Sequence, residues 1–116
     1  MKDIKISPSA EAALTEILEY SIERWGRARA DDYKNQLLNR VKSVARAEPP
    51  HPKRCDVLMR GKRKAASLVY CREGRHFIIL RETVMRIDVV EFIHESRNLE
   101  RLIDGLVGKA REKDSS

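Results

Sequence analysis

The N-terminal part of the chain shows two hydrophobic periodicities, one after the other. Residues 2–6 alternate between polar and apolar side chains and place both isoleucines on one face, which predicts a short half-buried strand. Ser7 and Pro8 follow, and because Ser is a favoured N-cap and Pro a favoured first helical residue, a helix should begin at Pro8. Its apolar stripe repeats every three or four residues until Gly26, which can adopt a left-handed conformation and is expected to end the helix.

A second helical pattern starts directly after Gly26 and continues to about residue 47. Because the break between the two helices is so short, they should form an antiparallel hairpin. Pro49, Pro50 and Pro52 are expected to stop the second helix, since Pro cannot continue the backbone hydrogen bonding. Residues 48–63 then read as a basic connector.

The C-terminal half alternates in the manner of strands. Residues 65–71, 76–80 and 87–93 are predicted strands, the first two joined by a hairpin turn that contains Gly74. Ser96 is the expected cap of a last helix over residues 99–106, and residues 109–116 are expected to form a polar tail. The fold class is therefore α+β: an N-terminal strand beside a later one, an antiparallel helical hairpin on one face of a small, mainly antiparallel sheet, and a short C-terminal helix.

Composition limits the kind of protein. A chain of 116 residues with 41% hydrophobic residues fits one folded domain, residues 1–116. No apolar run is long enough for a membrane span, and the N-terminus lacks the apolar core of a signal peptide, so we expect a cytoplasmic protein with no membrane partner. Cys55 and Cys71 are too few for a disulfide scaffold and are expected to remain thiols.

Basic residues gather in the middle of the chain. Residues 46–86 hold 11 basic and 4 acidic side chains, a net charge of +7, against +1 for residues 1–45 and −2 for residues 87–116. A basic segment of this kind attracts nucleic acid or an acidic protein surface. The alternative is a solvated basic face that keeps the protein soluble.

Motifs for the common enzyme classes and for metal binding are missing from the sequence. There is no GxSxG elbow, no glycine-rich phosphate loop and no dinucleotide fingerprint, so no cofactor and no small-molecule substrate are expected. No CxxC or HxxxH pair exists among the residues that could bind a metal, so we expect no metal site. Those residues are His51, Cys55, Cys71, His76 and His94.

One set of residues leaves an enzymatic alternative open. His94 follows a predicted strand, and Arg81 and Arg97 could lie near it if the strands pair in sequence order. A His that acts as acid or base, beside arginines that stabilise a phosphorane, would suit a metal-independent ribonuclease. The alternative is that His94 caps or packs the strand end and that the arginines are surface charge.

The order of these elements resembles the RelE/ParE toxin superfamily of bacterial toxin–antitoxin systems, and four local patterns resemble its ParE branch. They are Ile6-Ser7-Pro8-Ser9-Ala10-Glu11, Glu23-Arg24-Trp25-Gly26, Gly74-Arg75-His76-Phe77-Ile78-Ile79 and Phe92-Ile93-His94-Glu95-Ser96-Arg97. The similarity extends over about residues 2–106. The chain departs from the family pattern at Leu80-Arg81, where an aromatic pair is usual, and in a longer stretch over residues 63–74.

The resemblance implies one of two activities. RelE-like members cleave messenger RNA on the ribosome, whereas ParE-like members perform no chemistry and inhibit DNA gyrase until a ParD-like antitoxin neutralises them. No tyrosine follows Tyr70, and the Trp25-Gly26 break resembles ParE. We therefore expect a gyrase-directed toxin that is not an enzyme, with a RelE-like ribonuclease using His94, Arg81 and Arg97 as the alternative.

Two surfaces should carry these interactions. An antitoxin helix is expected in a groove between the helical hairpin and the sheet, although the residues that would line it could equally be ordinary core. They are Leu14, Leu18, Trp25, Tyr33 and Leu37. The target should meet a basic face, for which solubility alone is the alternative explanation. That face would comprise Arg60, Lys62, Arg63, Arg81, Arg86, Arg97 and Arg101.

Overall fold

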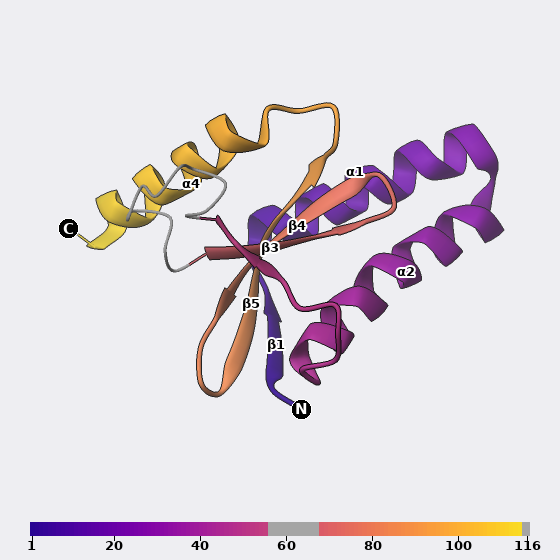
Figure 1. Ribbon diagram of the computed structural model, residues 1–116. Helices are drawn as coiled ribbons and strands as arrows, with labels where there is room; N and C mark the ends of the chain where they lie inside the picture. Colours follow the sequence, from indigo (N-terminus) through magenta and orange to yellow (C-terminus); the bar gives the residue numbers. More distant parts are fainter. Residues whose placement is uncertain (56–67, 115–116) are drawn as a thin grey trace.

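The computed structural model describes residues 1–55 and 68–114, with side chains up to residue 106. Its elements confirm the α+β class and most of the predicted order (Figure 1). They are β1 (Asp3–Ile6), α1 (Pro8–Trp25), α2 (Arg27–Ala45), β2 (Lys53–Arg54), β3 (Leu68–Glu73), β4 (His76–Glu82), β5 (Arg86–His94) and α4 (Leu99–Asp114). In the part of the chain so described, no helix combines the length and hydrophobicity needed to cross a bilayer.

One five-stranded sheet forms the centre of the molecule, in the order β1-β5-β4-β3-β2. β1 runs parallel to β5, and the other neighbours are antiparallel, so the N-terminal strand lies beside a later one as predicted, and the structure identifies that strand as β5. Pairing shifts by one residue between Ile79 and Leu80, where β5 carries the extra residue Val90. Because an extra residue reverses the alternation of side chains, Val89 and Phe92 both pack in the core beside the helical hairpin.

The helical hairpin begins and breaks where the sequence predicts. The side chain of Ser7 accepts a hydrogen bond from the backbone N–H of Ala10 at 3.0 Å, and Pro8 is the first helical residue. Gly26 separates α1 from α2 with φ +88°, a conformation that residues with a Cβ rarely adopt. These local signals are strong because each depends only on neighbouring residues.

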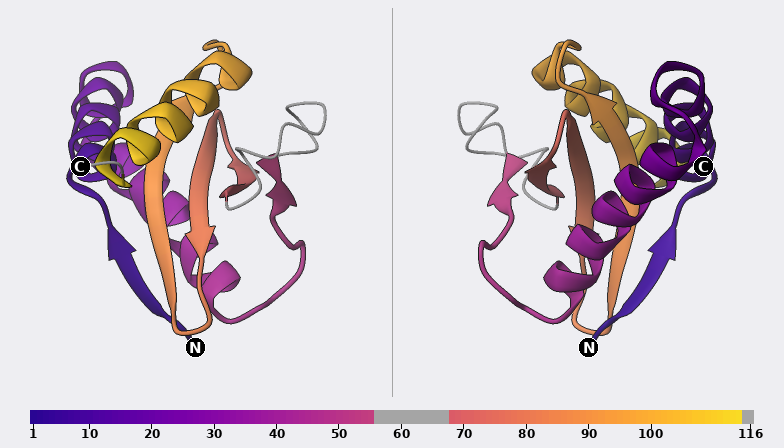
Figure 2. Two further views of the ribbon diagram at one scale, coloured as in Figure 1. Left: turned by 90° about the vertical axis from the view of Figure 1, so that its left-hand side faces the viewer. Right: turned by 90° about the vertical axis from the view of Figure 1, so that its right-hand side faces the viewer.

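Helices cover both faces of the sheet. The hairpin α1–α2 packs on one face and α4 on the other, which the two views of Figure 2 show in turn. The buried cluster beside the hairpin is Ala10, Leu14, Leu37, Val41, Val44, Ala45, Cys71, Ile78, Leu80, Ile87, Val89 and Phe92. The buried cluster beneath α4 is Cys55, Leu68, Ile79, Ile93 and Ile103. Cys55 and Cys71 therefore lie in different cores, and no disulfide joins them.

Three predicted details are wrong. Residues 53–54 form the short strand β2 inside the segment expected to be a connector. The cap of α4 is Asn98, whose side chain accepts the backbone N–H of Arg101 at 3.1 Å, whereas Ser96 contacts His94. α4 also continues to Asp114, so most of the expected polar tail is helical.

Candidate partner-binding groove

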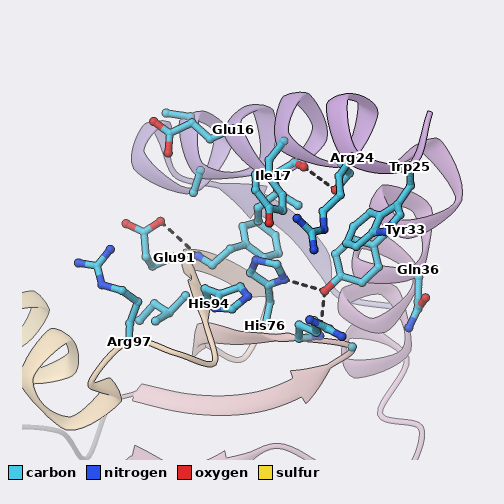
Figure 3. A pocket seen from close by; sticks show the side chains of 18 of the residues that line it. Glu16, Ile17, Arg24, Trp25, Tyr33, Gln36, His76, Glu91, His94 and Arg97 are labelled. Atoms are coloured by element: carbon cyan, nitrogen blue, oxygen red, sulfur yellow. Dashed lines mark hydrogen bonds between the residues drawn. The ribbon is translucent and has the colours of Figure 1, made fainter. Parts of the chain in front are cut away.

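A groove with a volume of about 1140 Å³ lies between the helical hairpin and one end of the β4–β5 pair (Figure 3). One side of α1 along its whole length and the first half of α2 form one wall, and the start of β4 and the end of β5 form the other. The lining residues are Ser9, Ala12, Ala13, Glu16, Ile17, Tyr20, Ser21, Arg24, Trp25, Arg29, Asp32, Tyr33, Gln36, Gly74, Arg75, His76, Glu91, Phe92, Ile93, His94, Arg97 and Leu102.

Two exposed aromatic side chains border the groove at the end of α1. Tyr20 is 58% exposed and Trp25 40% exposed, and their rings make an edge-to-face contact with centroids 6.3 Å apart. The guanidinium of Arg24 lies 6.0 Å from the centroid of the Trp25 ring. Large rings that remain exposed in this way are typical of protein-binding surfaces.

The floor of the groove is built around Tyr33. Its hydroxyl accepts the backbone N–H of Arg75 at 3.0 Å and lies 2.6 Å from Nδ1 of His76. Because the Arg75 N–H already donates to this oxygen, the hydroxyl proton can donate to His76 Nδ1. The neutral imidazole then carries its own proton on Nε2.

Gly74 allows this arrangement. Gly74 has φ +56°, and a Cβ built there would lie 2.5 Å from Cε1 of Tyr33. Any other residue would therefore meet both backbone strain and a clash with the ring. The turn between β3 and β4 can approach α2 this closely only because it has no side chain at that point.

The floor is polar but carries no charge on Tyr33 or His76 near neutral pH. Burial, and then the neighbouring His94, lower the pKa of His76 from 6.5 to about 4. Burial also raises the pKa of Tyr33. The His76 and His94 rings meet edge to face at 5.1 Å, and Nδ1 of His94 accepts the backbone N–H of Ser96 at 3.1 Å.

Charged side chains of both signs surround this neutral floor. Glu16, Asp32 and Glu91 contribute carboxylates, and the hydroxyl of Ser9 donates to Glu91 at 2.6 Å. The basic side chains of the lining are those of Arg24, Arg29, Arg75 and Arg97. A partner that fills the groove must therefore combine an apolar surface with charges of both signs. Within the described residues, no group of three or more His, Cys, Asp or Glu side chains could hold a metal ion.

The five residues predicted to contact an antitoxin lie in different environments. Trp25 and Tyr33 line the groove. Leu14 and Leu37 are buried in the core beneath it, and Leu18 is half-buried outside the lining. Their role in binding remains a prediction, for which the side chains of Trp25 and Tyr33 are the accessible candidates.

Tyr20 was missed by reasoning from the sequence, although a signal for it was present. It lies three residues after Ile17 and seven after Ala13, at the edge of the apolar stripe of α1. A large aromatic side chain at the edge of an apolar stripe can stay exposed beside the core, and this position marks it as a contact candidate.

The residues of the ribonuclease alternative are not brought together. His94 and Arg97 line the groove, and His94 is opposite His76 in the β4–β5 pair. Arg81 lies five residues after His76 in β4 and is opposite Asp88. Five residues correspond to a distance of about 16 Å along a strand. The expected proximity of Arg81 to His94 is therefore wrong.

The predicted basic face is also divided. Arg60, Lys62 and Arg63 lie outside the described residues. Arg81 and Arg86 lie toward the turn between β4 and β5, whereas Arg97 and Arg101 follow the opposite end of β5. The four described members of the predicted face thus form two separate groups at the two ends of the sheet.

Comparison with known proteins identifies the family. A family model described as the ParE toxin of the type II toxin–antitoxin system parDE matches residues 4–99, which is most of the chain. The chain belongs to the ParE toxin family. The match ends at Leu99, where α4 begins, so almost all of the helix that covers the second face of the sheet lies beyond the matched residues.

Individual relatives agree with this assignment. The Toxin ParE1 of Caulobacter vibrioides is 32% identical over 98 residues, which cover 84% of this chain and 94% of that toxin. The Toxin ParE1 of Mycobacterium tuberculosis is 32% identical over 97 residues, covering 83% and 92%. A chain from the chromosomal ParDE TA system of P. aeruginosa superposes with a TM-score of 0.63 at 14% identity, over 81% of this chain and 96% of the other, which shows a shared fold.

Proposed function

We propose that this ParE-family toxin arrests growth by binding and inhibiting DNA gyrase, and that a ParD-like antitoxin neutralises it by occupying the groove. The match to the ParE family over residues 4–99 is the observation that carries the proposal. Because gyrase acts on the bacterial chromosome, the proposed place of action is the cytoplasm.

The groove suits an antitoxin segment of a particular chemistry. Ala12, Ala13 and Ile17 offer an apolar strip along α1, bordered by Tyr20 and Trp25. An amphipathic helix could cover this strip with its apolar face, while its carboxylates meet the arginines of the lining. The similarity in fold to a chain from a ParDE system supports an antitoxin as the occupant.

Local geometry favours inhibition by binding over RNA cleavage. A general base needs a ring nitrogen that can reach the substrate. In His94 the lone pair of Nδ1 already accepts the Ser96 N–H, and in His76 Nδ1 contacts the Tyr33 hydroxyl. Arg81, which belongs to the ribonuclease set with His94 and Arg97, lies toward the other end of the strand pair.

Two assays in parallel test the proposed function. Purified chain should inhibit supercoiling by purified gyrase, and addition of the cognate antitoxin should restore it. The same preparation should leave messenger RNA intact in a translating ribosome reaction. RNA cleavage that depends on translation, with gyrase unaffected, would contradict the proposal and return the chain to the ribonuclease class.

A further inference from the structure

The strongly exposed, large apolar side chains of the described residues lie in two places. They are Met1, Tyr20, Trp25, Val84 and Met85. Tyr20 and Trp25 line the groove, whereas the other three lie at the opposite end of the sheet, where the β4–β5 turn (residues 83–85) is next to the N-terminus (Figure 2). Val84 is 88% exposed and Met85 75% exposed, more than either aromatic residue of the groove.

The formation of a hairpin does not explain Val84 and Met85. Tight turns between antiparallel strands favour Gly, Asn and Asp, because these residues accept positive φ or bond to the turn backbone. Neither Val84 nor Met85 has a positive φ, and Val is β-branched and depleted in such turns. A local sequence rule that is broken at the surface, with no gain in burial, indicates a functional constraint.

Hydrogen bonds hold the turn in one shape. The backbone N–H of Thr83 donates to the carbonyl of Arg86 at 2.9 Å, and the Arg86 N–H donates to the Thr83 hydroxyl at 2.9 Å. The same hydroxyl lies 3.0 Å from the Arg86 carbonyl, to which it donates. The N–H of Asp3 donates to the carbonyl of Met85 at 3.2 Å, which ties the turn to β1. A turn that is already ordered loses little entropy when it binds.

Charged side chains of both signs lie beside the apolar pair. The side chain of Arg86 forms an ion pair with Asp88, with Nε 2.6 Å from Oδ1, and its Nη2 donates a hydrogen bond to Oδ2 at 3.3 Å, which orients the guanidinium. Arg81 is opposite Asp88 in the neighbouring strand β4, and Asp3 is opposite Arg86 in β1, so basic and acidic residues lie side by side at this end of the sheet. A complementary surface would therefore present an apolar pocket bordered by charges of both signs.

We propose that the β4–β5 turn is a preformed anchor that inserts Val84 and Met85 into an apolar pocket, bordered by charges of both signs, on the protein target of this toxin. The identification of that target as gyrase rests on the proposed function. The anchor lies at the end of the sheet opposite the groove, so target and antitoxin would contact different surfaces of the chain.

The test uses the double variant Val84→Thr, Met85→Gln. Both replacements keep side-chain size, and Thr keeps the β-branch, so the polarity of the turn changes more than its shape. The matched control is Thr15→Ser, Glu19→Gln, two exposed positions of α1 that do not line the groove. Gyrase inhibition, antitoxin affinity, the thermal midpoint and growth arrest on expression are measured for all three proteins.

The turn variant should need at least tenfold more protein for half-inhibition of gyrase. Its thermal midpoint should move by no more than about 3 °C, and its affinity for the antitoxin by less than threefold. The control variant should match the parent chain. If the double variant is unstable, Met85→Gln alone should weaken inhibition in the same direction.

Each other outcome is also decisive. Full inhibition by a stable turn variant would overturn the anchor and leave the proposed function intact. If the parent chain does not inhibit gyrase, the proposed function fails, and the anchor is judged by growth arrest instead. Loss of arrest in the turn variant then supports it, and undiminished arrest overturns it. Binding of the parent chain to anionic lipid vesicles that the turn variant loses, with inhibition unchanged, would assign the turn to a membrane surface and also overturn the proposal.

Discussion

The two ends of the β4–β5 pair expose apolar side chains in opposite ways. At one end Tyr20 and Trp25 border a recess whose floor, Tyr33 and His76, is uncharged. At the other end Val84 and Met85 protrude from a turn, with Arg86 held beside them by Asp88. A recess suits a partner segment that lies across it, and a protrusion suits insertion into a partner. One small sheet can therefore bind two partners, each at a different surface.

The largest effect is expected from Gly74→Val, which should disrupt the end of the sheet that forms the groove and leave the β4–β5 turn unchanged. The added side chain would meet the Tyr33 ring and force a β-branched residue into positive φ, at a combined cost of about 2–5 kcal/mol in the free energy of unfolding. Urea denaturation measures this loss. Gly105→Ala is the matched control, because nothing lies within 4 Å of a Cβ at Gly105 and Ala favours the helix. Equal losses at both glycines would contradict the contact between Gly74 and Tyr33.

The next largest effect is a pH dependence of stability that arises from His76 in the groove floor. The pKa of His76 is about 4 in the folded chain and near 6.5 in the unfolded one, so the unfolded state binds the proton first as the pH falls. This contribution to stability is therefore complete above pH 6.5 and is lost between pH 6.5 and 4, by an amount on the order of 3 kcal/mol. In denaturation curves across this pH range, the free energy of unfolding should decrease less for His76→Gln than for the parent chain. An identical pH dependence of the variant and the parent chain would show that His76 is not buried in its neutral form.

The groove aromatics should affect antitoxin binding more than folding. Replacing Tyr20 and Trp25 together by Ala removes the large side chains that a partner helix would cover, which should weaken antitoxin binding by about 2 kcal/mol or more. Calorimetric titration with the antitoxin measures the affinity. Affinity that stays within threefold of the parent value would place the antitoxin elsewhere.

The smallest effect is expected at Arg86. Its ion pair with Asp88 is partly exposed, so Arg86→Ala should change the free energy of unfolding by about 0–1 kcal/mol. Association with the target should nevertheless become slower and less dependent on salt, because surface charge mainly affects the rate of encounter. Stopped-flow measurements at two salt concentrations would show it, and an unchanged rate would remove Arg86 from the contact.

The sequence predicts the elements well where the determining residues are neighbours. Ser7, Pro8 and Gly26 define the ends of α1 through local bonding, and these predictions hold. Ser96 and Asn98 are both favoured caps two positions apart, and only the structure distinguishes them. The two-residue strand β2 has no periodicity to detect.

Which residues meet at each end of the sheet depends on pairing between residues that are distant in the sequence. The register that places His76 beside His94 also separates His94 from Arg81, and the extra residue at Val90 has no sequence signature. The hydrogen bond between Tyr33 and His76 joins residues 43 positions apart. Val84 and Met85 lie between the predicted strands 76–80 and 87–93, but their exposure and their position opposite the groove follow only from the fold.

The separation of the two surfaces is tested most directly by one titration. Gyrase is inhibited with a fixed amount of the Tyr20→Ala, Trp25→Ala variant, and antitoxin is added until supercoiling returns. The variant should inhibit gyrase yet require at least tenfold more antitoxin for neutralisation than the parent chain. A folded variant that no longer inhibits gyrase would place the target at the groove and contradict the assignment of target and antitoxin to opposite ends of the sheet.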